Sequence, residues 1–174
     1  MEAIHDGLIV LRRREGTNFI RMEEVPSTPS GNLGELILST FAAHDLLRAS
    51  DSDEKLLAIH PRLVAHARLE QISKPSLRRW QAESLILRLE SGFPFRLDVQ
   101  PLVAEFLASC DGEKTAAQVI EELAAKANAP FDRVSSECVA MIRKLIERGF
   151  MTAKESDLAP PAGTETASAA SGLA

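Results

Sequence analysis

The sequence predicts an α+β fold in which N-terminal β-hairpins and a helix pack with a C-terminal winged-helix-like module. Two observations support this prediction. In residues 1–92, short runs of alternating apolar and polar residues, typical of strands, surround one stretch with helical spacing. In residues 93–153, a short strand is followed by three helical patterns that tight turn signals separate. The two regions are therefore expected to be a β-rich N-terminal part and a helical module.

The first expected element is a hairpin near the N-terminus. An apolar run over residues 7–12 and an alternating segment over residues 18–24 predict two strands with a turn between them. After a loop, a helix over residues 34–48 is indicated by apolar side chains at helical spacing, namely Leu36, Ile37, Phe41 and Leu47. One or two further helical turns over residues 54–60 are expected to end at Pro61.

A second, longer hairpin is expected between Pro61 and the helical module. Residues 63–70 alternate and predict one strand, residues 74–76 predict a loop, and residues 82–90 predict the return strand. A helix over residues 80–89 is the alternative interpretation, because leucine and glutamate favour helices.

The C-terminal module carries the clearest signals. Residues 95–100 alternate as a strand does, and Pro101 suits the first turn of a helix. Thr115 is placed to cap a second helix, and Gly149 to end a third helix over residues 132–148. Residues 154–174 are rich in Ala, Ser, Gly, Pro and Thr, and this composition predicts a disordered tail.

The overall charge gives no argument for a polyanionic partner. The chain has a formal net charge of −5, whereas proteins that bind nucleic acid or an anionic membrane surface usually carry a basic balance. The apolar runs are too short to span a bilayer, and the N-terminus has its charges in the opposite order to a secretory signal. We therefore expect a cytoplasmic protein with no membrane partner.

No residue pattern predicts catalysis, a cofactor or a metal site. No glycine-rich loop follows a strand, and the four histidines lack the spacing of a metal pair. His44 and Asp45 are adjacent on a helix and do not face one another. Cys110 and Cys138 are interpreted as buried packing residues, because neither has the base or the electropositive surroundings of a nucleophile. No catalytic, cofactor-binding or metal-ligating residue is therefore assigned, although an enzyme with an unrecognised site stays open.

The third helix of the module is where a DNA-binding winged helix would place its reading residues. It offers Arg133, Arg143, Lys144 and Arg148, but residues 101–150 hold six basic and eight acidic residues, a net of −2. A DNA reader usually shows a basic face, so DNA is a disfavoured partner. A winged-helix DNA-binding regulator remains the alternative function.

Two family resemblances bear on function. Residues 101–151 resemble the PqqD-like peptide-binding domains, through an apolar helix, the turn formed by Asp111, Gly112 and Thr115, and a last helix that ends in Leu145–Phe150. Residues 6–151 also resemble the region that follows the cofactor domain in certain bacterial S-adenosylmethionine-dependent methyltransferases. The chain begins where that cofactor domain would have ended, so none of the family's catalytic residues can be carried over.

Together these resemblances imply a non-catalytic accessory or substrate-recognition module that binds a protein or peptide, with a separate methyltransferase chain as one candidate partner. The expected contact surface is the groove between the strand at residues 95–100 and the helix at residues 132–148. An extended peptide would pair with an exposed strand edge there. The residues predicted to line this groove are Leu97, Val99, Arg143 and Lys144.

Overall fold

A computed structural model describes residues 9–13, 19–22, 29–154 and 157 of the chain. Within these residues the fold is α+β, as predicted, with elements in the order α1 (Leu33–Ala49), α2 (Asp53–Ala58), β1 (Pro61–Leu63), β2 (Ala67–Ser76), β3 (Arg79–Leu89), β4 (Arg96–Val99), α3 (Pro101–Ala108), α4 (Ala116–Ala127), α5 (Phe131–Glu147) and β5 (Met151–Ala153). No helix in the described ranges is long and apolar enough to cross a membrane.

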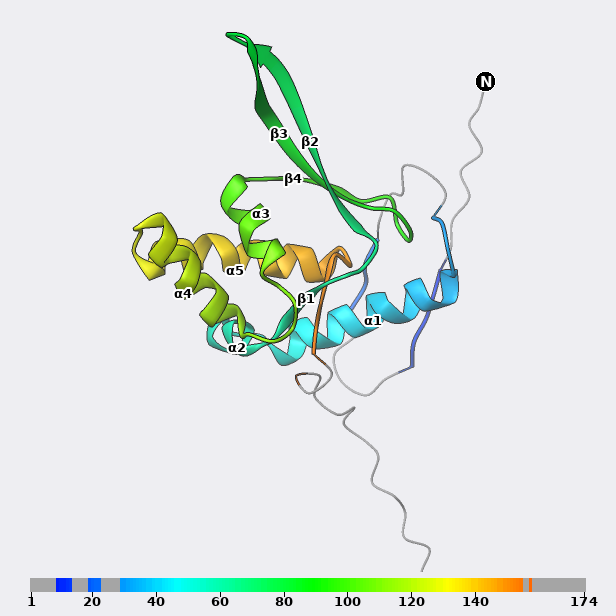
Figure 1. The fold of residues 1–174 in the computed structure, drawn as a ribbon. Coiled ribbons are helices and arrows are strands. Elements are labelled where there is room, and N and C mark those ends of the chain that lie inside the picture. The colour runs from blue at the N-terminus through cyan, green and yellow to red at the C-terminus, as the bar shows by residue number, and fades with distance from the viewer. Residues whose placement is uncertain (1–8, 14–18, 23–28, 155–156, 158–174) are drawn as a thin grey trace, which may run out of the picture.

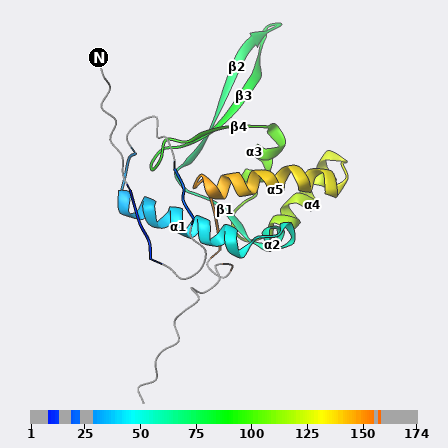
Figure 2. The same ribbon diagram turned by 180° about the vertical axis from the view of Figure 1, so that it is seen from behind.

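The strands form two antiparallel sheets. One has the strand order β2-β3-β4, and the other pairs β1 with β5. The β2–β3 hairpin projects away from the helices, while α5 lies between β4 on one side and α1 on the other in both views (Figures 1 and 2). The helices therefore gather at the base of a protruding β-ribbon.

Helix α1 confirms the first predicted helix and shows why it begins where it does. The side chain of Asn32 accepts hydrogen bonds from the backbone N–H groups of Gly34 and Glu35, at 3.0 and 3.4 Å. Such an N-cap satisfies donors that have no partner inside the helix. The short α2, capped by Ser52, confirms the predicted turns before Pro61.

The strand predicted over residues 63–70 is two strands that belong to different sheets. β1 ends at Leu63 and β2 begins at Ala67, whose N–H donates to the carbonyl of Val64 across a turn at 3.0 Å. The apolar alternation continues through this turn, so periodicity alone does not reveal the break. Tertiary pairing of β1 with β5 decides it, since Leu63 lies opposite Met151.

The second hairpin is confirmed, but its predicted loop was wrong. Lys74, Pro75 and Ser76 belong to β2, and the turn consists of Leu77 and Arg78. Proline is tolerated in β2 because β2 is an edge strand, where a missing N–H need not remove a ladder hydrogen bond. The alternative of a helix over residues 80–89 was also wrong, because β3 occupies this segment.

The C-terminal helices match the predicted capping signals. The hydroxyl of Thr115 accepts from the N–H of Gln118 at 3.3 Å, and the Gln118 side chain accepts from the N–H of Thr115 at 2.9 Å. Gly149 adopts a φ of +76°, the left-handed conformation expected after α5. The chain then turns back, with the N–H of Phe150 donating to the carbonyl of Leu145 at 2.9 Å.

Replacing Thr115 by alanine is expected to lower the free energy of unfolding by about 1 kcal/mol. The reason is that the hydroxyl of Thr115 is the acceptor for the N–H of Gln118, whereas the reciprocal bond uses the backbone N–H of Thr115 and is retained in alanine. Chemical denaturation measures the effect. Thr115→Ser keeps the hydroxyl and serves as the control, and an equal loss in both variants would contradict the capping explanation.

One hydrophobic core serves both predicted regions. The buried cluster includes Leu46 and Leu56 from the N-terminal helices, Leu87 from β3, and Phe106 and Ile142 from the C-terminal helices. The expected boundary between residues 92 and 93 falls between β3 and β4, which are neighbours in one sheet. The two regions therefore share a sheet as well as a core in the described part of the chain.

The hairpin predicted at the N-terminus is not formed by the residues described there. Residues 9–13 and 19–22 have no strand pairing, and the predicted turn lies outside the described residues. The two segments instead contact α1. Arg12 pairs with both carboxylate oxygens of Asp45 at 2.8 and 2.9 Å, and the ring of Phe19 stacks on His44. The tail predicted over residues 154–174 also lies outside the described residues, except for Lys154 and Asp157.

Candidate functional site

The outer edge of β4 has backbone groups that no described residue pairs with. The N–H of Glu90 donates to the carbonyl of His66, so the even-numbered residues at this end of β3 face β2. Leu85 and Leu87 therefore face β4 and pair with Val99 and Leu97. It follows that Arg96 and Asp98 direct their N–H and C=O groups toward the open edge.

The C-terminal end of helix α5 comes close to the residue that precedes β4. The guanidinium of Arg148, at the end of α5, lies 4.7 Å from the centre of the Phe95 ring, which immediately precedes β4. Lys144 and Met141 are four and seven residues before Arg148 and therefore share its side of the helix. The β4–α5 edge is defined here as Phe95, Arg96 and Asp98 together with Met141, Lys144 and Arg148.

Two of the four residues predicted to contact a partner lie in the core. Leu97 is 8% exposed and Val99 is 5% exposed, and both belong to the buried cluster. Alternation along β4 sends their side chains to the helices and leaves those of Arg96 and Asp98 on the outer face of the sheet. A partner at this strand would therefore meet the backbone of β4 and not the Leu97 and Val99 side chains.

The other two predicted residues lie on different sides of α5. Arg143 donates to Asp53 at 3.0 Å and to the carbonyls of Ser50 and Asp51 at 3.4 and 3.5 Å, which ties α5 to the junction of α1 and α2. Lys144 is exposed and is rotated about 100° from Arg143 around the helix. Helical spacing thus puts Lys144, but not Arg143, on the side of α5 that carries Arg148.

Sequence reasoning did not single out Phe95, Met141 or Arg148 for this site. The three-residue and four-residue spacing of Met141, Lys144 and Arg148 was available as a signal for one helix face. Their relation to β4 was not available, because it depends on how α5 packs beside the sheet. The resulting edge holds the cations Arg96, Lys144 and Arg148 and the carboxylate of Asp98, and Arg96 lies 3.5 Å from the carboxylate of Glu70.

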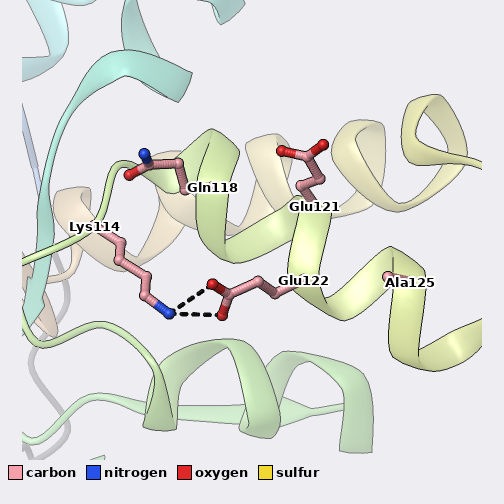
Figure 3. Close-up of a pocket in the computed structure, with 5 residues that line it drawn as sticks. All are labelled: Lys114, Gln118, Glu121, Glu122 and Ala125. Carbon is pink, nitrogen blue, oxygen red and sulfur yellow. Dashed lines mark hydrogen bonds and ion pairs between the residues drawn. The ribbon is translucent and has the colours of Figure 1, made fainter.

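Two hollows on the described surface lie elsewhere, along α4 and between α3 and α4. One of about 300 Å³ lies along α4 and is lined by Lys114, Gln118, Glu121, Glu122 and Ala125 (Figure 3). Lys114 and Glu122 neutralise each other in it, at 2.6 and 2.8 Å. Gln118 is engaged in the cap of α4. This hollow therefore follows from the packing at the start of α4.

Both cysteines are packing residues in the described structure. Burial raises the pKa of the Cys110 thiol to about 12 and that of the Cys138 thiol to about 11. The neighbouring Asp111 and Glu137 add to these increases. Both thiols are therefore protonated at neutral pH and are poor nucleophiles. Among the described residues, no three His, Cys, Asp or Glu side chains are grouped as a metal site.

The fold and this edge define a small α+β module with an open sheet edge beside a helix. Residues 39–153, more than half of the chain, match the family described as a domain of unknown function, DUF7782. The chain belongs to this family.

Two curated proteins are similar to part of the chain, and both are named PqqA binding protein. One, from Bradyrhizobium diazoefficiens, is 35% identical over 51 residues, which are 29% of this chain and 50% of that protein. The other, from Rhodopseudomonas palustris, is 36% identical over 56 residues, which are 32% of this chain and 55% of that protein. The chain thus spans about half the length of the curated relatives it matches.

Proposed function

We propose that this protein is a peptide-binding accessory module in which an extended peptide adds a strand to the outer edge of β4 and contacts α5. The observation that carries the proposal is the open edge itself, where Arg96 and Asp98 direct backbone groups away from β3. Extended peptides bind such edges through backbone hydrogen bonds, and neighbouring side chains give specificity. The similarity to proteins named for binding PqqA supports a peptide as the ligand.

The side chains around the edge favour a particular kind of peptide. Phe95 and Met141 are partly buried against the core and offer an apolar floor. Lys144 offers an exposed cation on the side of α5 that carries Arg148, whereas Arg96 pairs with Glu70 at 3.5 Å and Arg148 lies over Phe95. The peptide is therefore expected to present apolar side chains toward α5 and at least one carboxylate toward Lys144.

Action with a separate methyltransferase chain, as implied by the resemblance in residues 6–151, remains a prediction. Both similar curated proteins are PqqA binding proteins, and neither name refers to methyl transfer. Winged-helix DNA binding through α5 also remains a prediction. Of its four predicted bases, Arg143 is engaged with Asp53 and Arg148 lies over Phe95, which leaves fewer cations for phosphates.

Replacing Asp98 by proline is expected to lower affinity for a PqqA peptide at least tenfold. Proline removes the N–H that faces the open edge and leaves the hydrogen bonds of Leu97 and Val99 with β3 in place. Titration calorimetry with a synthetic PqqA peptide and the full chain measures this. Lys144→Glu is expected to weaken binding as well, because it reverses a cation at the same edge.

The matched control is Gln71→Pro, which removes an outward-facing N–H from β2, the other edge of the same sheet. It is expected to leave peptide affinity unchanged. Circular dichroism of each variant reports whether it is folded. If folded Asp98→Pro and folded Lys144→Glu both bind as the unsubstituted chain does, or if Gln71→Pro alone loses binding, the peptide does not bind at β4.

A further inference from the structure

The β2–β3 hairpin ends in a tip that no described element covers (Figure 1). Beyond the last residue pair that β4 supports, Leu85 and Val99, five further pairs of β2 and β3 extend to the turn. At about 3.3 Å for each pair, this ribbon reaches roughly 17 Å past the three-stranded part of the sheet. At its end, Leu77 is 93% exposed and Trp80 is 73% exposed.

The two residues of the turn at this tip do not suit the backbone conformation that they adopt. Leu77 and Arg78 have φ values of +41° and +72°, so both central residues of a two-residue hairpin turn are left-handed. Turns of this type favour Asn-Gly, because glycine has no β-carbon to clash in the left-handed region and the short polar side chain of asparagine tolerates it. Backbone strain that does not stabilise the fold is typical of functional sites, where particular side chains are needed to contact a ligand or partner.

The charge of the tip is opposite to that of the rest of the chain. Residues 73–82 contain Lys74, Arg78 and Arg79 and no acidic residue, so this segment has a formal charge of +3. Since the whole chain has a formal net charge of −5, all other residues together carry −8. Lys74 pairs with Glu83 at 3.0 Å. No carboxylate among the described residues pairs with Arg78 or Arg79. The tip therefore combines two available guanidinium groups with an exposed aliphatic and an exposed indole side chain.

We propose that this tip, formed by Leu77, Arg78, Arg79 and Trp80, docks into the interface of an anionic lipid bilayer. An aliphatic side chain can enter the acyl boundary, an indole favours the headgroup level, and arginines bind anionic headgroups. The negative charge of the rest of the chain does not prevent this docking, because the ribbon keeps it about 17 Å from the membrane surface. This distance is about twice the Debye length of about 8 Å at physiological salt, so the repulsion is screened.

The same features fit other partners less well. A stable protein interface buries about 1,200–2,000 Å², far more than the end of one hairpin offers, whereas a bilayer requires no shape complementarity. Nucleic acid would engage the arginines and the indole, but two available cations give few phosphate contacts, and Leu77 offers no ring to stack on a base.

The chain contains one tryptophan, so its emission reports on the tip alone. The full chain is titrated with vesicles of phosphatidylcholine containing phosphatidylglycerol. The Trp80 emission is expected to shift to the blue and the protein to float with the vesicles. Vesicles of phosphatidylcholine alone are expected to produce neither effect. Arg78→Glu together with Arg79→Glu is expected to weaken vesicle partitioning by at least about thirtyfold, because each arginine contributes about fivefold and the new carboxylates repel the anionic headgroups.

A second variant separates docking from folding. Leu77→Asn together with Arg78→Gly places the favoured turn residues at the tip, and it is expected to raise the melting temperature while it lowers partitioning at least tenfold. Lys126→Glu with Arg133→Glu makes the same charge change on the helices and is expected to leave partitioning unchanged. Three results would overturn the proposal: no shift with anionic vesicles, a change only when oligonucleotide is added, or a shift that follows protein concentration without lipid.

Discussion

Replacing Phe150 by alanine is expected to lower the free energy of unfolding by about 3–5 kcal/mol, the largest effect of any substitution considered. Phe150 is fully buried and joins three parts of the fold. Its N–H donates to Leu145 at the end of α5, its carbonyl accepts from Val64 before β2, and its ring fills the core. Removal of the ring leaves a cavity where these elements meet, and close packing prevents them from filling it.

Urea denaturation with the full chain measures this loss, and Phe131→Ala is the matched control. Phe131 begins α5 and is 38% exposed, so its truncation is expected to change stability by less than about 1 kcal/mol. Similar losses in the two variants would mean that Phe150 does not have the central packing position described above.

Replacing Leu97 by alanine is expected to lower stability by about 2–4 kcal/mol and to leave the peptide affinity of the folded protein within about tenfold. Leu97 was predicted from the sequence to touch a partner, but its side chain lies in the core opposite Leu87. The proposed peptide uses the backbone of β4, which this substitution retains. The substitution therefore distinguishes packing of the Leu97 side chain in the core from direct contact of this side chain with the peptide.

The control is Leu69→Ala, because Leu69 lies opposite Leu87 on the other side of β3 and is 47% exposed. It is expected to lower stability by less than about 1 kcal/mol. Thermal melts report stability, and calorimetry below the melting transition reports affinity. If Leu97→Ala keeps the full melting temperature and loses the peptide, the side chain contacts the partner, as the sequence analysis predicted.

The sequence by itself determined most of the helices, because their signals are local. The side chains of Asn32 and Thr115 accept hydrogen bonds from backbone N–H groups at the start of a helix, and Gly149 ends one. In each case the groups involved lie within a few residues along the chain. The apolar faces of α3, α4 and α5 were also predictable, since a helix buries residues at fixed spacing. The second hairpin followed in the same way from alternation on β2 and β3.

Only the tertiary structure decided which strands pair and which side chains remain exposed. Pairing of β1 with β5 joins residues about 90 positions apart and divides an apparently continuous strand at residues 64–66. Contacts of Arg12 and Phe19 with α1 replace the hairpin predicted near the N-terminus. Neither result can be predicted from local periodicity in the sequence, because each depends on surfaces that form only when the helices pack together.

The candidate site shows the same division. The sequence predicted a strand at residues 95–100 and a helix at residues 132–148, because both segments carry clear patterns. It could not determine that Leu97 and Val99 point inward, or that Arg143 binds Asp53 while Lys144 remains exposed. A strand can bury either of its two faces and a helix can turn any side to a neighbour, so packing against the core decides which residues a partner can reach.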